Sequence, residues 1–102
     1  MKEEYKPLDL VKNEAANRFE MNVEGNTAII EYKQYPGKIA LLHTEVPSQL
    51  EGKGAATAII EKTLDYIEKK NFTLIALCPM VVAYIKRHPE WKRIMDKGIS
   101  NI

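Results

Sequence analysis

The sequence is poor in the residues on which metal centres and disulfide frameworks depend. It contains one cysteine and two histidines in 102 residues. A single cysteine excludes an internal disulfide, and two isolated histidines do not complete a cysteine-rich zinc site. We therefore expect neither a disulfide framework nor a bound metal.

The sequence also has no large excess of positive or negative charge. Fifteen Lys and Arg residues stand against fourteen Asp and Glu residues, so the formal net charge is +1. Counterion release requires a strongly basic body, so we expect no nucleic-acid partner. No apolar run approaches the roughly 18 residues of a membrane span, and the first residues lack the apolar stretch of a signal peptide. These absences predict a soluble, cytoplasmic protein without a membrane partner.

The chain does contain enough apolar residues for one modest core. Hydrophobic residues make up 45% of it and charged residues 28%, which is typical of a folded domain. We predict one domain over residues 11–98, with a loose tail over 1–10 and a short tail over 99–102. The apolar residues Leu8, Leu10 and Val11 form a candidate edge strand.

Three segments in the first half have the alternation of β-strands. They cover residues 18–23, 27–35 and 38–46. Gly25-Asn26 and Pro36-Gly37 have the composition of tight turns between them. The first two apolar faces consist of Phe19, Met21, Val23, Ala28, Ile30 and Tyr32, whereas residues 39–42 are continuously apolar, as in a central strand. Together the segments predict an antiparallel meander.

The period changes to that of a helix after Pro47. Apolar residues between Ala56 and Ile67 recur at helical spacing, and Lys69-Lys70-Asn71 is a suitable end. We then expect a buried strand over 73–78, a helix from Pro79 to about His88 and a last short helix over 89–97. A helix that joins strands 38–46 and 73–78 makes a right-handed crossover, so these strands are parallel. The predicted fold class is α+β, with a β-meander followed by β-α-β-α and a short C-terminal helix.

The segment from Gln49 to Ala56 is the most informative part of the sequence. Gly52 and Gly54 let the backbone curl, and the following helix offers unpaired N–H groups at its start. Ala55 and Ala56 leave that first turn sterically bare. The segment has neither the Walker spacing nor the three glycines of a dinucleotide fingerprint. A phosphate site and an ordinary strand-to-helix turn both remain open from these residues alone.

The spacing of several motifs resembles that of the Gcn5-related N-acetyltransferases. The matching residues are Val46-Pro47, Gln49-x-x-Gly52-x-Gly54, Leu77-Cys78-Pro79 and Ala83-Tyr84-Ile85-x-x-His88-Pro89-Glu90. The resemblance covers roughly residues 11–95 and is to a short subgroup. The pair of helices that larger members insert between their first two strands, where it helps to wall the acceptor site, is absent here.

The resemblance implies a minimal acyl-coenzyme A N-acyltransferase fold with two splayed parallel strands. It also implies that the turn amides hold the pyrophosphate of an acyl-coenzyme A and that the Val46 backbone binds the pantetheine arm. The cofactor-binding residues predicted in this way are Val46, Gln49, Glu51, Gly52, Lys53, Gly54, Ala55 and Ala56. Acetyl-coenzyme A enters this prediction as a cosubstrate, and no metal is implied.

Cys78 and Tyr84 are candidate catalytic residues. A thiol at the start of a helix tends toward the thiolate, and the resemblance puts Cys78 where the parallel strands splay. It would either carry the acyl group or line the pocket, unless it is an ordinary core residue. In larger relatives a tyrosine of the following helix protonates the departing thiolate, and Tyr84 matches it; the alternative is a packed aromatic ring.

His43, Glu45 and Arg87 complete the set of candidates. His43 and Glu45 point to the same side of a strand, so either could take the proton of an incoming ammonium; both could also be plain surface residues. Arg87 belongs to a basic stretch that either is a solvated face or contacts the 3′-phosphate or adenine end of coenzyme A.

These observations favour an acyl-coenzyme A-dependent N-acyltransferase that acts on a primary amine of unknown identity. One alternative is a coenzyme A-binding module without efficient turnover. Another is a small interaction protein, which leaves the two-glycine turn unexplained. The expected partners are an acyl-coenzyme A and an amine acceptor. An exposed edge of the meander allows a weak dimer as well as a monomer.

Overall fold

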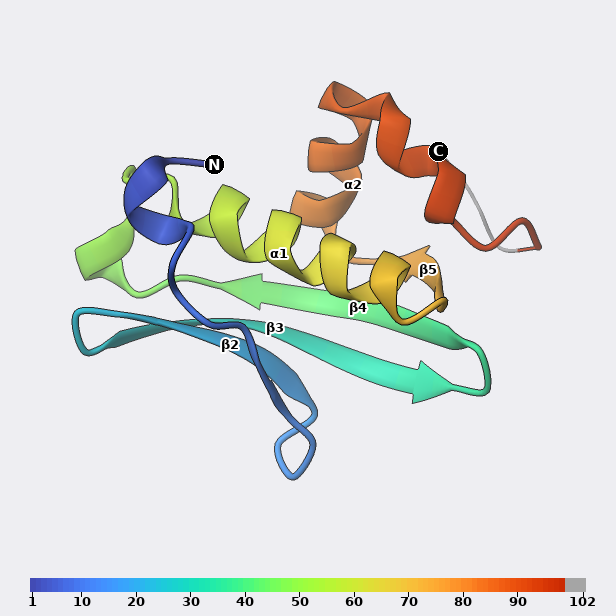
Figure 1. Ribbon diagram of the computed structural model, residues 1–102, viewed down its shortest axis with the longest axis horizontal. Coiled ribbons are helices and arrows are strands. Elements are labelled where there is room, and N and C mark those ends of the chain that lie inside the picture. The colour runs from blue at the N-terminus through green and yellow to red at the C-terminus, as the bar shows by residue number, and fades with distance from the viewer. Residues whose placement is uncertain (99–102) are drawn as a thin grey trace.

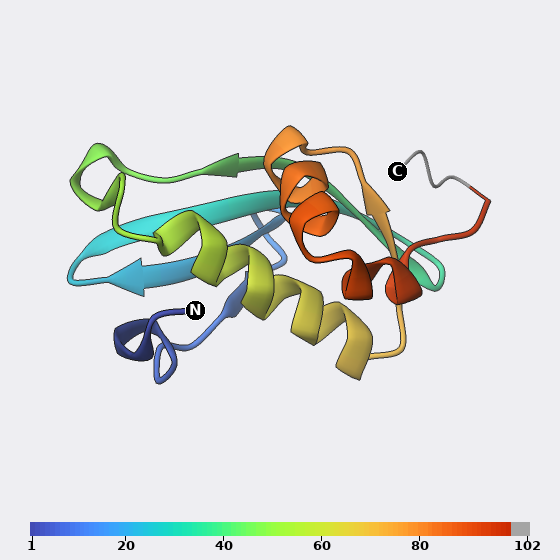
Figure 2. The same ribbon diagram turned by 90° about the horizontal axis from the view of Figure 1, so that it is seen from above.

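Five strands form one sheet in the computed structural model, which describes residues 1–98. They lie side by side in chain order and are β1 (Val11–Asn13), β2 (Arg18–Val23), β3 (Asn26–Tyr35), β4 (Lys38–Glu45) and β5 (Thr73–Ala76). All neighbours are antiparallel except β4 and β5, which are parallel. Helices α1 (Ala55–Lys69) and α2 (Pro79–Arg87) lie on the same face of the sheet (Figures 1 and 2). The α+β fold is thereby confirmed. The edge strand begins only at Val11, so Leu8 and Leu10 of the predicted patch lie outside it.

The core lies between the sheet and the helices. The alternating residues predicted for β2 and β3 face α1, and Phe19, Met21 and Ile30 are fully buried there. The Phe19 ring packs against Tyr32 and Tyr66, with centroids 4.8 Å and 5.4 Å away. The face of α1 turned to the sheet consists of Ala55, Ala58, Ile59, Ile60, Thr63, Leu64 and Ile67. Burial of this stripe fixes where the N-terminal end of α1 lies on the sheet.

Strands β4 and β5 separate at their carboxyl ends. Their last paired residues are Leu41 and Ala76, whereas β4 continues to Glu45. The amides of Leu77 and Cys78 both donate to the Leu41 carbonyl, at 3.1 Å and 2.9 Å, and the chain then enters α2. Leu42 of β4 has no pairing partner on β3 and forms a β-bulge at this point. The predicted splay of the two parallel strands is present.

Several boundaries differ from those predicted. The hairpin between β2 and β3 has Glu24 and Gly25 as its central residues, with φ of 53° and 84°, so the turn lies one residue earlier than expected. The Asn22 side chain accepts from the Gly25 amide at 3.0 Å and fixes this register. Strand β5 ends at Ala76, before Cys78. The amides of Leu77 and Cys78 both donate to the Leu41 carbonyl and so do not continue the regular pairing of parallel strands.

The last helix is also shorter than predicted. It is a 3₁₀ helix, η3 (Pro89–Ile94), and ends before Lys97. Met95 instead forms a parallel bridge to Leu74, and the Asp96 amide donates to the Leu74 carbonyl at 2.8 Å. Pairing along the free edge of β5 therefore replaces the last helical turn. The predicted tail over 99–102 lies outside the described residues.

Residues 1–10 are not a loose tail. They contain a 3₁₀ helix, η1 (Glu3–Tyr5), and the Tyr5 side chain is 2% exposed. The Lys62 ammonium of α1 donates to the carbonyls of Lys6 and Leu8, at 3.2 Å and 2.7 Å. A buried aromatic ring and two hydrogen bonds to α1 hold the segment against the domain, and the sequence pattern gave no sign of them.

Candidate functional site

The turn between β4 and α1 depends on its two glycines. After a short 3₁₀ helix, η2 (Ser48–Leu50), Gly52 and Gly54 adopt φ of +74° and +84°, a region that side chains with a Cβ rarely occupy. Gly54 directly precedes α1 and has no side chain to cap it. The first amides of α1 are therefore left for another acceptor, as an anion site requires.

A hollow of about 380 Å³ opens beside this turn. It is lined by Val46, Leu50, Glu51, Gly52, Gly54, Ala55, Ala56, Thr57 and Met80. Nothing lies within 4 Å of the point where a Cβ on Gly52 would sit, so the main chain is open there. The hollow thus joins the end of β4 to the start of α1 and the start of α2, and its small glycine and alanine residues leave room for a phosphate group.

Six of the predicted cofactor-binding residues line this hollow: Val46, Glu51, Gly52, Gly54, Ala55 and Ala56. Gln49, Lys53 and Arg87 do not line it. Gln49 is exposed on η2, Lys53 turns toward the N-terminal segment, and Arg87 is exposed at the last residue of α2.

Leu50, Thr57 and Met80 were missed as lining residues. The positions of Leu50 and Thr57 within the turn and the first helical turn offered a signal. Met80 enters through the packing of α2, which the sequence does not show.

Cys78 lies at the start of α2, as predicted, and is buried. Its side chain is 1% exposed, and its Sγ lies 3.2 Å from the Thr44 hydroxyl oxygen. Cys78 does not line the hollow, although its neighbour Met80 does. The thiol therefore lies where β4 and β5 separate, and its hydrogen-bond partner, Thr44, belongs to β4.

Tyr84 faces α1 from the middle of α2. It is 3% exposed, and its hydroxyl donates to the Glu61 carboxylate at 3.3 Å. Its ring packs against the tilted ring of His88, with a centroid distance of 4.5 Å. Burial, followed by the Glu61 carboxylate, raises the pKa of Tyr84 above its usual value, so the hydroxyl keeps its proton at neutral pH. Tyr84 is available as a proton donor, and its proton is directed to Glu61.

His43 and Glu45 lie together beyond the last paired residues of β4 and β5. Their side chains point to the same side, and His43 Nε2 lies 4.0 Å from a Glu45 carboxylate oxygen. Glu31 of β3 is the cross-strand partner of His43, so a second carboxylate occupies the same face. This face is the one opposite α1 and α2, since the neighbouring residue Thr44 is buried on the helix side.

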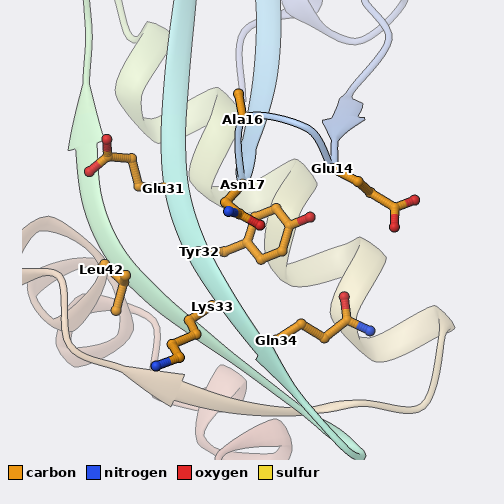
Figure 3. A pocket seen from close by; sticks show the side chains of 8 residues that line it. All are labelled: Glu14, Ala16, Asn17, Glu31, Tyr32, Lys33, Gln34 and Leu42. Carbon is orange, nitrogen blue, oxygen red and sulfur yellow. The ribbon is translucent and has the colours of Figure 1, made fainter.

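A second and larger hollow, of about 700 Å³, contains none of the residues predicted as functional. It lies where β3 runs past the start of β2, beside the loop that contains Glu14 and Asn17 (Figure 3). Glu31 and Leu42 lie toward β4, whereas Asn17, Tyr32 and Gln34 lie toward the loop (Figure 3). Glu31 connects this hollow with the face that carries His43.

Residues 1–98 contain neither a metal-binding cluster nor a membrane-spanning helix. In that range no group of three or more His, Cys, Asp or Glu side chains is arranged to hold a metal ion. The same range holds no helix with the length and apolar character needed to cross a membrane.

Comparison with known proteins identifies a family and several relatives of this chain. A family model described as GCN5-related N-acetyltransferase matches residues 18–94, about three quarters of the chain. Protein NATD1 from Gallus gallus is 26% identical over 87 residues, which cover 81% of this chain and 78% of that protein. Protein NATD1 from Mus musculus has the same identity and coverage, and the Homo sapiens protein is 26% identical with 76% of its length covered.

Proposed function

Because the chain belongs to the GCN5-related N-acetyltransferase family, we propose that it is an acyl-coenzyme A-dependent N-acyltransferase. The donor is acetyl-coenzyme A and the acceptor is a primary amine. The observation that carries the proposal is the hollow at the Gly52–Gly54 turn, which presents bare main chain at the start of α1 and adjoins the splay of β4 and β5. An anion at this position is favoured by the free amides and by the helix dipole.

In this proposal the donor is bound by the turn and by the end of β4. The amides of Gly52, Gly54, Ala55 and Ala56 hold the pyrophosphate, with Gln49, Glu51 and Lys53 around it. The Val46 backbone pairs with the pantetheine arm, which passes between the separated strands. Arg87 contacts the 3′-phosphate or adenine end, since it is exposed and basic at the far end of α2.

The transfer itself requires only proton handling and positioning by this chain. The acceptor ammonium loses a proton to His43 or Glu45, and the free amine attacks the thioester carbonyl. A carbon–nitrogen bond forms, the carbon–sulfur bond breaks, and Tyr84 supplies a proton to the departing thiolate. The nitrogen loses its second proton as the amide forms, and that proton restores Tyr84 through solvent. The carboxylates of Glu31 and Glu45 on that face attract a cationic acceptor.

We assign Cys78 to the wall of the thioester site and not to a covalent step. Its 1% exposure and its contact with Thr44 favour direct transfer. In the covalent alternative the acyl group would move from coenzyme A to the Cys78 sulfur and then to the amine. Mass spectrometry after acetyl-coenzyme A alone distinguishes the two: direct transfer leaves Cys78 unmodified, and a hydroxylamine-reversible acetyl group on Cys78 contradicts it.

A coenzyme A-binding module without efficient turnover is the second candidate. It is favoured by two existing contacts: the Tyr84 hydroxyl already donates to Glu61, and the Cys78 thiol already shares a hydrogen bond with the Thr44 hydroxyl. Calorimetry with acetyl-coenzyme A, followed by an assay of free thiol release with a panel of primary amines, separates the candidates. We expect binding and amine-dependent thiol release; binding without release supports the module, and the absence of binding contradicts both.

A further inference from the structure

The N-terminal segment, residues 2–8, lies directly on the candidate coenzyme A turn. Its 3₁₀ helix lies beside the loop that leads into α1 (Figures 1 and 2). The Tyr5 hydroxyl donates to the Lys53 carbonyl at 2.8 Å, across 48 positions of sequence. Lys53 stands between the two glycines, so this hydrogen bond holds the middle of the turn.

The same segment is fixed to α1 as well as to the turn. The hydrogen bonds from Lys62 to the carbonyls of Lys6 and Leu8 tie its far end to the middle of α1. Burial, the largest cause, raises the pKa of Tyr5 above its usual value, so its hydroxyl remains a donor at neutral pH. A turn with two positive-φ glycines has high intrinsic freedom, and a partly buried hydrogen bond to its central carbonyl restricts it.

The hollow needs positive charge from outside its own lining. None of its nine lining residues is basic, and Glu51 adds a carboxylate. The phosphates of coenzyme A carry several negative charges, which amides alone leave partly uncompensated. The Lys2 side chain lies over Gly54: its Cε and Cδ are 3.4 Å and 3.7 Å from the point where a Gly54 Cβ would sit. The Lys2 ammonium is one bond beyond Cε, and Gly54 directly precedes α1.

We propose that residues 2–8 are part of the acyl-coenzyme A site, with Tyr5 as the residue that positions the Gly52–Gly54 turn and Lys2 as a cationic contact for the phosphates. The assignment rests on the proposed function, because the ligand is the same. The segment acts as a clamp in the free protein: Tyr5 sets the direction of the turn amides before the ligand arrives, and Lys2 adds the charge that the hollow lacks.

The test uses calorimetry with coenzyme A on the whole chain and four variants. Tyr5→Phe keeps the buried ring, and Lys2→Met keeps the alkyl chain over Gly54. Each is expected to weaken coenzyme A binding about 3- to 10-fold, while Lys2→Arg binds as the parent does. Lys69→Met is the matched control, since it removes the same charge at the other end of α1, about 20 Å away, and leaves affinity unchanged.

Two readouts separate these roles from a general loss of stability. The difference between the parent and Lys2→Met should shrink as NaCl rises from 50 to 300 mM, because salt screens an exposed charge. Without any ligand, Tyr5→Phe should speed hydrogen exchange of the Lys53 amide, which donates to the Leu50 carbonyl at 3.2 Å.

Parent-like affinity in both Tyr5→Phe and Lys2→Met overturns the clamp while the proposed function stands. Unchanged exchange of the Lys53 amide in Tyr5→Phe overturns the positioning role of Tyr5, whatever the ligand. If the parent itself fails to bind coenzyme A, the proposed function falls and the phosphate role of Lys2 falls with it.

Discussion

At the scale of single residues, Gly54 is where backbone geometry and the candidate ligand site coincide. Its φ of +84° is strained for any residue with a Cβ, and its Cβ position lies 3.4 Å from Lys2 and 3.8 Å from Tyr5. A side chain there would strain the turn, whereas its Cβ would meet Lys2 and Tyr5 only at ordinary van der Waals distance. The requirement for glycine thus comes from the positive φ.

We expect Gly54→Val to lower coenzyme A affinity at least tenfold, about 1.4 kcal/mol, because the turn amides lose their alignment. Calorimetry measures the affinity, and circular dichroism checks that the variant folds. Gly37→Val is the matched control: its φ is +74° and nothing lies within 4 Å of its Cβ position, in a turn remote from the hollow. If folded Gly54→Val binds coenzyme A as tightly as the parent, coenzyme A does not bind at this turn.

Tyr84→Phe tests the proposed proton donor. Turnover should fall on the order of 100-fold with little change in coenzyme A affinity, because only the departing thiolate loses its proton source. Tyr66→Phe, which deletes the hydroxyl of another ring packed in the core, should leave turnover within about twofold. A fully active Tyr84→Phe variant would leave the Tyr84–Glu61 hydrogen bond as a structural link between α2 and α1.

At the scale of elements, the β2–β3 hairpin departs from the residue preferences of its turn. Both central residues have positive φ, and the first of them is Glu24 at 53°. Turns of this geometry favour Asn-Gly, because Asn tolerates the left-handed region better than Glu does. The hairpin forms in spite of Glu24, held by the pairing of β2 with β3 and by the Asn22–Gly25 hydrogen bond.

Glu24→Asn should therefore stabilise the protein by about 0.5 kcal/mol, since it relieves an unfavourable φ at an exposed position. Chemical denaturation gives the free energy of unfolding. Glu24→Gln removes the same charge without the preference for positive φ, so it should leave stability unchanged. A gain of the same size in both variants would assign the effect to charge.

The sequence predicted the elements whose residues follow a strand or helix period, and failed where a distant contact decides the structure. The burial of Phe19, Met21 and Ile30 and the helical stripe of α1 were readable from spacing. The early end of β5 was not readable from spacing, because it depends on a carbonyl of β4 that accepts hydrogen bonds from two amides. The candidate site divides in the same way: its glycines are in one motif, but Lys2, Tyr5 and Met80 come from elsewhere in the chain.

At the scale of the whole molecule, two carboxylates hold segments together near opposite edges of the sheet. Asp96 pairs with Lys38 at 3.2 Å and accepts from Thr73 at 3.1 Å, and it joins the segment after η3 to β4 and β5. The hydrogen-bonded Lys38 ammonium is the largest cause that lowers the pKa of Asp96. Glu20 on β2 accepts from Asn13 of β1 at 3.1 Å, and the hydrogen bond from Arg18, at 2.6 Å, is the largest cause that lowers its pKa.

A lowered pKa in the folded state means that each group stabilises the fold above its unfolded pKa, about 4, and that this stabilisation is lost as pH falls through the folded pKa. The melting temperature should therefore fall as the pH decreases from about 5 to 3. Asp96→Asn should melt lower than the parent at pH 7, and the two curves should converge at low pH. Asp9→Asn, at an exposed position, serves as the control; parallel curves for Asp96→Asn and the parent would contradict the prediction.

The most direct test of the central claim is a backbone amide NMR titration with coenzyme A. We expect the largest shifts at Gly52, Gly54, Ala55 and Ala56, with smaller shifts at Val46 and Lys2. Saturable binding with its largest shifts at another place, such as the hollow beside Glu14 and Gln34, or no saturable shifts at all, would contradict the claim that this turn receives the acyl donor.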